Sequence, residues 1–343
     1  MLVNEVIEQS LSDLHVTTGD VPYIRTHTGL LHPVKSFGIV DSTVMKEIVD
    51  ILLGGRPMSE KTVDCSYTQK NRRFRVNISQ NVRGISVSMR SIPTKIPTPE
   101  EVWLPPQAIN LFNKEKGIIL VTGPTGSGKT TTLAAMLERI NQTQPKHVIT
   151  LEDPIEFVFN NKKALVHQRE KGAHFDDFST TIRTILREDP DIIMVGEMRD
   201  LATIEAALTL AETGHLVIST LHTNDAVQTV DRIVYSFPWD MQNQVRAQFA
   251  LSLVGIISQI LVPNIDNTGR VPAREIMINS DSIRNLISRG EISQLYSVLE
   301  MSKRDGMILM DDALIHLIKA GIIAPSAAIN HIRDMGRLES LSE

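Results

Sequence analysis

The feature that most constrains this chain is the stretch Gly123–Thr130, which reads Gly-Pro-Thr-Gly-Ser-Gly-Lys-Thr and fits the pattern G-x-x-x-x-G-K-[ST]. The apolar run Gly117–Thr122 precedes it, and the helix-like stretch Thr130–Leu137 follows. A glycine-rich turn between a buried strand and a helix N-terminus presents backbone N–H groups and the positive end of the helix dipole to an anion. The pattern therefore favours a phosphate-binding loop over a glycine-rich turn that binds nothing.

Two side chains of this loop have predicted roles in binding ATP with Mg²⁺. Lys129 would reach the β- and γ-phosphates, and the hydroxyl of Thr130 would ligate the metal. The predicted nucleotide-binding residues of the loop are Gly123, Pro124, Thr125, Gly126, Ser127, Gly128, Lys129, Thr130 and Thr131.

Composition excludes some classes of protein. The chain has 343 residues, enough for about two domains, and its net charge of −5 does not favour attraction of the whole chain to nucleic acid. A single cysteine, Cys65, excludes an intrachain disulfide and a cysteine zinc cluster. The longest apolar candidate, Phe249–Val262, is interrupted by polar residues and is interpreted as a buried amphipathic helix, so we expect no membrane span.

The first part of the chain predicts a small α+β domain. A helical pattern covers Val44–Leu53, and polar and apolar residues alternate in Arg73–Ile78 and Gly84–Arg90, which predicts a hairpin with one solvated face. The proline-rich stretch Ile92–Pro106 is incompatible with a helix or a central strand and is interpreted as a linker, or as the start of the second domain.

The pattern after the linker predicts an α/β domain with a parallel sheet. Short apolar strands alternate with helical segments, and ligands of such sheets bind at the carboxyl ends of the strands. The predicted strands are Ile118–Thr122, His147–Leu151, Ile192–Val195 and Leu216–Thr220. From Arg284 onward the chain reads as short helices. We expect one domain with its linker over residues 1–97, and an ATPase domain with C-terminal helices over 98–343.

Carboxylates follow two of these strands. Asp191–Glu197 resembles a Walker B strand, in which Glu197 would hold Mg²⁺ through water or orient the attacking water, although an acidic cap on a buried strand is the simpler alternative. After His147–Leu151 come Glu152, Asp153 and Glu156. Glu156 is well placed in the sequence to polarise water, but position alone does not choose among the three.

Two histidines flank the predicted strand Leu216–Thr220. His215 precedes it and His222 follows it. A lone histidine at a strand end is more often structural, but two around one strand suggest groups that donate to a phosphate or a carboxylate. A metal site built on them is disfavoured, because no tight spacing such as H-x-x-x-H occurs.

Four of the arginines in the predicted first domain are candidates for nucleotide contact: Arg73, Arg75, Arg83 and Arg90. Arg73 and Arg75 occupy alternate positions of a strand and therefore share a face. This face is either solvated, or it supplies an arginine to a nucleotide bound by a neighbouring subunit, where it would stabilise charge on the γ-phosphoryl group.

The order of these motifs resembles the secretion-ATPase superfamily, and within it the branch of type IV pilus retraction ATPases. The central matching segments are the loop with its helix start, the acidic box, the Walker B region and the histidine box. Shorter matches at Ser12–His15 and Ile283–Ile287 narrow the resemblance to the retraction branch. The central segments are Gly123–Thr132, Thr150–Phe157, Leu186–Asp200 and Thr213–Asp225.

This resemblance implies a PAS-like α+β N-terminal domain, a RecA-like P-loop NTPase domain and a ring-shaped homohexamer. By position, Glu156 corresponds to the catalytic glutamate of the acidic box and Glu197 to that of the Walker B motif. His215 and His222 correspond to the histidine pair. The four arginines named above correspond to a region that approaches nucleotide.

The implied function is a cytoplasmic motor that hydrolyses ATP to drive pilus disassembly and twitching motility. It would work at the cytoplasmic face of the inner membrane through a membrane platform protein, with no nucleic acid and no small-molecule substrate other than ATP. A retraction accessory paralogue and a type II or type IV secretion ATPase remain alternatives. A RecA-type nucleic-acid motor is disfavoured by the acidic charge balance, and a non-hydrolysing regulator by the presence of both Glu156 and Glu197.

Overall fold

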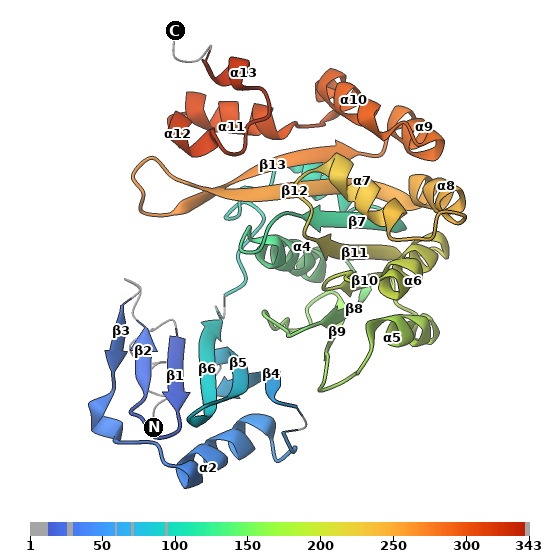
Figure 1. The fold of residues 1–343 in the computed structure, drawn as a ribbon. Helices are drawn as coiled ribbons and strands as arrows, with labels where there is room; N and C mark the ends of the chain where they lie inside the picture. The colour runs from blue at the N-terminus through green and yellow to red at the C-terminus, as the bar shows by residue number, and fades with distance from the viewer. Residues whose placement is uncertain (1–12, 26–29, 59, 70–71, 93–94, 340–343) are drawn as a thin grey trace. The chain divides into compact units, whose positions relative to one another are not determined.

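The computed structural model describes residues 13–25, 30–58, 60–69, 72–92 and 95–339, drawn in colour in Figure 1. Two units emerge from the packing of the chain. Unit 1 consists of Met1–Ile96 together with the later segments Asp153–Val158 and Glu170–Phe175, and unit 2 consists of Pro97–Glu152, Phe159–Arg169 and Asp176–Glu343. No pattern in the sequence had placed the two later segments in unit 1. Ser12 of the matching segment Ser12–His15 and Pro93 of the proline-rich stretch Ile92–Pro106 lie outside the described residues.

Unit 1 contains an antiparallel sheet against which helix α2 packs. Its strands run in the order β3-β2-β1-β6-β5-β4, and each pair of neighbouring strands is antiparallel. The elements are β1 Asp13–Thr17, β2 Tyr23–Arg25, β3 Leu31–Pro33, a 3₁₀ turn Lys35–Phe37, α2 Ser42–Leu53, β4 Thr62–Gln69, β5 Arg72–Asn81 and β6 Gly84–Ile92.

Helix α2 has a clear start, a clear end and one buried face. The side chain of Asp41 accepts hydrogen bonds from the N–H groups of the first turn, and Gly54 ends the helix in the left-handed conformation. Met45 and Val49 pack into a core with apolar residues of the sheet. The predicted helix is therefore confirmed, while the PAS-like character of this domain stays a prediction.

The predicted hairpin is also confirmed, as β5 and β6. Phe74, Val76 and Ile78 point into the core and are at most 1% exposed. Arg73 and Arg75 alternate with these residues and therefore lie on the opposite face of the sheet, as strand periodicity requires.

Unit 2 is built on the predicted parallel sheet. The order is β13-β12-β7-β11-β10-β8-β9, with β12, β7, β11, β10 and β8 mutually parallel and β13 antiparallel to β12. The strands are β7 Gly117–Thr122, β8 His147–Glu152, β9 Leu165–Glu170, β10 Ile192–Val195, β11 Leu216–Leu221, β12 Leu253–Pro263 and β13 Arg270–Ile278. All four predicted strands are present, so the α/β class is confirmed.

The helices of unit 2 alternate with its strands, and a further group of helices follows the last strand, β13 (Figure 1). They are α3 Pro106–Leu111, α4 Lys129–Thr143, α5 Phe178–Ile185, α6 Leu201–Glu212, α7 Ala226–Tyr235, α8 Gln242–Ser252, α9 Asp281–Arg289, α10 Leu295–Met301, α11 Met310–Lys319, α12 Pro325–Ala328 and α13 Met335–Glu339, with 3₁₀ turns at 186–188, 292–294 and 303–305. Residues from α11 to α13 share a second core with β12 and β13. The predicted run of short C-terminal helices is thus confirmed.

The interpretation of Phe249–Val262 as one helix was wrong. Helix α8 ends at Ser252, and the rest of the stretch is the strand β12, hydrogen-bonded to β7 on one side and β13 on the other. A strand between two others is buried on both faces, so it reads as a nearly continuous apolar run that periodicity cannot distinguish from a buried helix.

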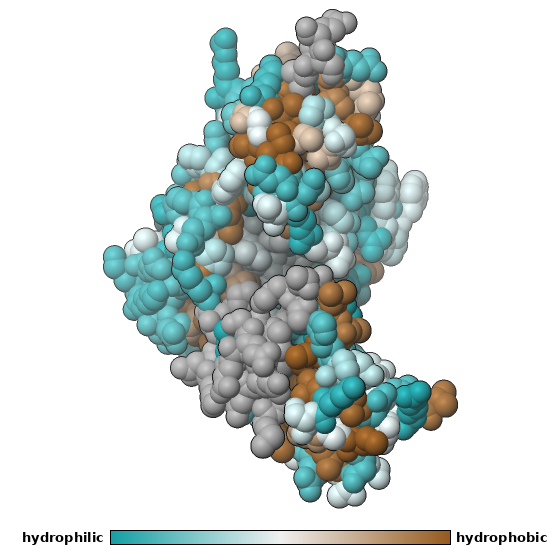
Figure 2. All heavy atoms as spheres, turned by 90° about the vertical axis from the view of Figure 1, so that its left-hand side faces the viewer, coloured by the Kyte–Doolittle hydropathy of each residue, from teal (hydrophilic) through white to brown (hydrophobic). Residues whose placement is uncertain are grey.

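Two features are relevant to a membrane role, the apolar character of the helices and the apolar side chains at the surface. Among the helices of the described ranges, none combines the length and the apolar character needed to cross a bilayer. In Figure 2, apolar side chains reach the surface at the top of the view, in the C-terminal part of the chain. Ile329 and Met335, 48% and 42% exposed, belong to this part.

Candidate nucleotide-binding and catalytic site

The glycine-rich loop connects β7, whose residues are all buried, to the first turn of α4. Gly123, Gly126 and Gly128 have φ angles of 141°, 79° and 85°, which side-chain-bearing residues rarely adopt. A Cβ atom on Gly123 would lie 2.1 Å from the carbonyl oxygen of Gln259, so this position accepts only glycine. The loop is held tightly against β12 and ends at a helix N-terminus, which is the geometry that binds phosphate.

Lys129, the first residue of α4, lies inside this loop. Its side chain is buried, and its Nζ donates hydrogen bonds to the carbonyl oxygens of Gly123 at 2.7 Å and Pro124 at 3.1 Å. Burial lowers the pKa of Lys129, and the carboxylate of Glu197 opposes this effect. The ammonium group is therefore a buried cation whose nearby negative charge is Glu197.

His222 and Glu197 lie next to Lys129 at the carboxyl edge of the sheet, and the three side chains contact one another in series. The Nδ1 of His222 lies 3.4 Å from Lys129 Nζ, and its Nε2 lies 3.0 Å from a carboxylate oxygen of Glu197. An ammonium group only donates, so Nδ1 accepts, and Nε2 carries the ring proton and donates to Glu197. The other carboxylate oxygen of Glu197 accepts a hydrogen bond from Arg199 at 2.9 Å. The structure thus joins Lys129, His222 and Glu197 in one chain of contacts.

The oxygen groups at this site suit Mg²⁺. Thr130 offers a hydroxyl in the first turn of α4, and Glu197 offers a half-buried carboxylate. The Oγ of Ser127 in the loop is buried and has no hydrogen-bond partner among the described residues. Mg²⁺ is usually held by one or two protein oxygens together with substrate phosphates, so the small number of protein oxygens here fits the metal. In the described part of the chain, no cluster of three or more His, Cys, Asp or Glu forms a separate metal cage.

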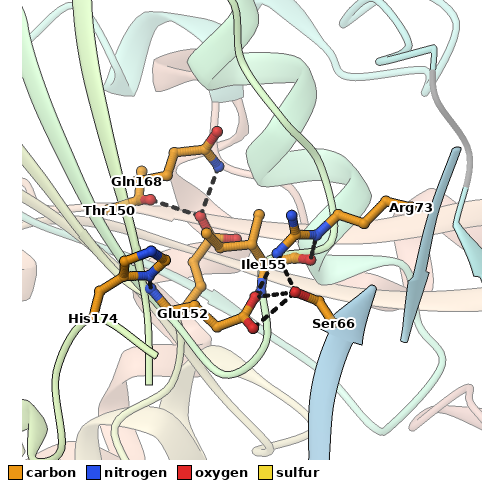
Figure 3. Close-up of polar contacts among 8 residues, drawn as sticks. Ser66, Arg73, Thr150, Glu152, Ile155, Gln168 and His174 are labelled. Atoms are coloured by element: carbon orange, nitrogen blue, oxygen red, sulfur yellow. Dashed lines mark hydrogen bonds and ion pairs between the residues drawn. The ribbon is translucent and has the colours of Figure 1, made fainter. Parts of the chain in front are cut away.

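The three carboxylates after β8 have different environments. Glu152 is 5% exposed, and one of its oxygens accepts hydrogen bonds from Thr150 at 2.6 Å and Gln168 at 3.0 Å, as Figure 3 shows. Asp153 lies 3.9 Å from the ammonium of Lys171 in unit 1. Glu156, also in unit 1, is half-buried. Glu152 is thus engaged in the packing of unit 2, and the catalytic role of Glu156 stays a prediction.

His215 does not join His222. It precedes β11, where its Nδ1 lies 3.3 Å from the carbonyl oxygen of Leu210 and 3.2 Å from the hydroxyl of Thr213. His222 follows the same strand, and a strand of this length separates its two ends by roughly 20 Å. The structure therefore places His215 at the amino edge of the sheet, and its predicted catalytic role stays a prediction without support from the geometry of this chain.

Arg73 is engaged inside unit 1, as Figure 3 shows. Its Nε donates to the carbonyl oxygen of Ile155 at 2.9 Å, and a second nitrogen donates to the hydroxyl of Ser66 and to the carboxylate of Glu170. Glu170 is 4% exposed and also accepts a hydrogen bond from the N–H of Ile155. Arg73 therefore attaches two later segments of the chain to the N-terminal sheet, a role that the sequence did not predict.

The other three of the four candidate arginines are exposed. Arg90 pairs with Asp13 at 2.7 Å, and Arg83 pairs with Asp20 at 3.3 Å. Arg75 lies directly opposite Arg90 in the β5–β6 ladder, and no ion pair of its guanidinium is found among the described residues. The face of the sheet away from the core thus carries arginine side chains that reach solvent.

Sequence reasoning missed two buried residues beneath the loop, Gln259 and Arg274. They face each other across β12 and β13, and Gln259 donates a hydrogen bond to the carbonyl of Ser127. The polar pair Ser258–Gln259 in an otherwise apolar strand was the available signal, because a buried polar side chain needs a specific partner.

A phosphate loop, a buried lysine and a glutamate at the carboxyl edge of a parallel sheet define a P-loop nucleoside triphosphatase. The family model described as "Type II/IV secretion system protein" matches residues 57–313. The chain therefore belongs to this family of ATPases, with the RecA-type sheet order of its nucleotide-binding domain.

Individual relatives are similar over most of the chain. A twitching motility protein of Neisseria gonorrhoeae is 49% identical over 78% of this chain and 71% of its own length. The type IV pilus retraction ATPase PilT of Pseudomonas aeruginosa is 43% identical over 92% of this chain and 93% of its own length. A crystal structure of the pilus retraction motor PilT with bound ADP is 41% identical, covers 99% of this chain and 98% of its own, and gives a TM-score of 0.89.

Proposed function

We propose that this chain is the motor ATPase of type IV pilus retraction. The observation that carries the proposal is the contact chain from Lys129 through His222 to Glu197 beside the phosphate loop. The similarity to retraction ATPases along nearly the full length supports the particular task. The work of the motor would be pilus disassembly, which underlies twitching motility.

The chemistry of ATP hydrolysis at such a site is mainly positioning and charge neutralisation. The loop N–H groups and Lys129 would bind the phosphates. Thr130 and Glu197 would hold Mg²⁺, which when bound neutralises part of the phosphate charge. Glu197 keeps its orientation through His222 and Arg199, and Glu156 is the proposed base for the attacking water.

A neighbouring copy of the chain would complete the site. We propose a homohexamer in which an arginine of unit 1 reaches the nucleotide of the adjacent subunit. Arg75 is the best candidate, because it is exposed and unpaired among the described residues, whereas Arg73 is bound to Glu170. An arginine supplied in trans accelerates phosphoryl transfer by ~10³–10⁵ where it operates. The ring would act at the cytoplasmic face of the inner membrane on a membrane platform protein.

The biochemical test compares the purified parent with Glu197→Gln. The parent should hydrolyse ATP with Mg²⁺ and have the mass of a hexamer by native mass spectrometry. The variant should bind ADP like the parent and hydrolyse ATP at least ~100-fold more slowly, because a neutral amide neither neutralises charge nor polarises water. Asp200→Asn, which removes an exposed carboxylate three residues later, is the control for charge loss. Equal turnover in Glu197→Gln and parent would refute the assignment of Glu197.

The cellular test addresses the biological task. A strain lacking the gene should assemble pili and fail to retract them, as seen by fluorescence microscopy of labelled pili. Expression of the parent should restore retraction, and Glu197→Gln should not. Normal retraction in the deletion strain, with the proteins of similar sequence also deleted, would refute the retraction role and leave the ATPase activity standing.

A further inference from the structure

The described residues include an arginine that is buried without a carboxylate. Arg274, on β13, is 5% exposed, and no acidic side chain of the described ranges forms an ion pair with it. Burial lowers the pKa of Arg274 to about 10. Burying a cation is unfavourable unless its donors are satisfied, so the partners of its guanidinium indicate what this residue does.

The first partner is the amide of Gln259, which in turn contacts the phosphate loop. Arg274 Nε donates to Gln259 Oε1 at 2.7 Å, and the hydroxyl of Thr132 donates to the same oxygen at 2.8 Å. With two donors on its oxygen, the amide has only one orientation available, with the NH₂ group toward the loop. There it donates to the carbonyl oxygen of Ser127.

The bond to the Ser127 carbonyl determines the direction of the next N–H. In a planar trans peptide the C=O and the following N–H point in opposite directions. Because Gln259 holds the carbonyl of Ser127 against β12, the N–H of Gly128 points away from β12. This leaves the N–H of Gly128, at the N-terminus of α4, free of β12, and backbone N–H groups at such a position bind phosphate.

Besides a longer contact of 3.3 Å with the hydroxyl of Thr132, Arg274 has partners in the segment that connects the two units along the chain. Its two terminal nitrogens donate to the carbonyl oxygens of Trp103 at 2.8 Å and Val102 at 2.7 Å. Unit 2 begins at Pro97, only a few residues earlier. Trp103 has a φ angle of 56°, an uncommon conformation for a residue with a side chain. One guanidinium therefore binds both this segment and the amide that orients the loop.

We propose that Arg274 is a positioning residue for nucleotide binding: through Gln259 it holds the phosphate loop in its binding conformation, and it couples that loop to the connecting segment at Val102–Trp103. The inference rests on the proposed nucleotide site. It differs from the roles of Lys129 and Glu197, because Arg274 forms no direct hydrogen bond with the loop among the described residues and acts on it through Gln259.

The first experiment measures ADP binding by titration calorimetry in the presence of Mg²⁺, with the full chain. Arg274→Met should weaken ADP binding about tenfold, the equivalent of one charge-assisted hydrogen bond. The KM for ATP should rise by a similar factor while kcat changes less than about threefold, because the loop holds substrate and transition state alike. Arg274→Lys should lie between parent and Arg274→Met, since one ammonium cannot reach all the acceptors.

Gln259→Glu is a second variant that tests the inference if Arg274→Met fails to fold. The carboxylate gives Arg274 a counter-charge but cannot donate to the Ser127 carbonyl, so the fold should persist while ADP binding weakens. Asn141→Leu is the matched control. Asn141 is a fully buried amide near the other end of the same helix α4, bonded to the carbonyl of Asn160. It should lower thermal stability and leave ADP affinity unchanged.

The coupling to the connecting segment has its own readout. Trp103 and Trp239 are the two tryptophans of the chain. In a Trp239→Phe background, ADP should change the fluorescence of Trp103, and Arg274→Met should abolish this change at saturating ADP.

Three results would overturn the inference. They are ADP affinity within twofold of the parent in both Arg274→Met and Gln259→Glu, an equal loss of affinity in Asn141→Leu, or an unaltered Trp103 response in Arg274→Met. Failure of the parent itself to bind ADP would instead refute the proposed nucleotide site.

Discussion

The stability of unit 2 should fall as the pH rises from about 4.5 to 7, because of Glu275 on β13. This side chain is 2% exposed, and its two oxygens accept hydrogen bonds from the N–H groups of Ala226 at 2.8 Å and Met310 at 3.4 Å. These are the first residues of α7 and α11. Burial, reinforced by the charge of Asp225, raises the pKa of Glu275 to about 7, against the opposing effects of the two N–H groups and Arg333.

The sign follows from which state keeps the proton. The ordinary value for glutamate is 4.5, so between 4.5 and about 7 the folded chain keeps a proton on Glu275 that the unfolded chain has released. Protonation therefore stabilises the fold fully below pH 4.5, and this contribution is lost as the pH rises through 7. At 1.36 kcal/mol per pH unit, the interval from 4.5 to about 7 corresponds to at most about 3 kcal/mol.

The assay is urea unfolding of the parent and Glu275→Gln at pH 5, 6, 7 and 8. Tryptophan fluorescence suits it, since Trp103 and Trp239 both lie in unit 2. The amide cannot ionise, so the free energy of unfolding of the variant relative to the parent should rise by about 2–3 kcal/mol between pH 5 and pH 8. Glu205→Gln, an exposed position on α6, corrects for the loss of one negative charge. A difference between Glu275→Gln and parent that is the same at all four pH values would refute the reasoning.

Other perturbations test the loop, the segments attached by Arg73 and the single thiol. Gly123→Ala should abolish ADP binding and cost about 1–3 kcal/mol of stability, because its Cβ would meet the backbone of β12. Gly126→Ala has free space around it and should cost only about 1 kcal/mol of stability. Normal ADP binding by Gly123→Ala would contradict this prediction. Arg73→Met should lower the stability of unit 1 by about 3–5 kcal/mol, because it leaves Glu170 buried without its cation. It should also speed amide hydrogen exchange in residues 153–158 and 170–175, and unchanged exchange in these segments would contradict the prediction. Burial raises the pKa of Cys65 to about 11, so iodoacetamide at pH 8 should alkylate it only after unfolding, as measured by mass spectrometry.

Features decided by neighbours in the sequence were predictable. The phosphate loop was predictable because its positive-φ positions, such as Gly128, favour glycine, and the parallel strands because short apolar runs alternate with helical segments. Polar residues that follow the parallel strands were expected near the loop, because the carboxyl ends of such strands meet at one edge. The position of His215 could not be inferred from its residue type. It lies at the opposite edge of the sheet because it precedes β11, and the length of that strand separates it from His222.

The strand β12 could not be predicted from its own residues. Its apolar run is compatible with helix and strand alike, and only its position between β7 and β13 makes it extended. The same position explains its polar residues. Ser258 lies opposite Thr122 of β7, with their hydroxyls 2.8 Å apart, and Gln259 reaches the phosphate loop. Gln259, one of the polar residues that made the stretch look amphipathic, therefore holds the loop.

Arg73 separates what strand periodicity determines from what tertiary packing determines. Periodicity placed its side chain on the face of β5 away from the core, and the structure agrees. Whether an arginine on such a face reaches solvent depends on its neighbours in space, and Glu170 lies 97 residues later in the chain. Arg75, on the same face, lacks such a carboxylate among the described residues and extends outward. Two arginines that are equivalent in pattern therefore have different surroundings: one is bound to a buried carboxylate within unit 1, and the other is exposed.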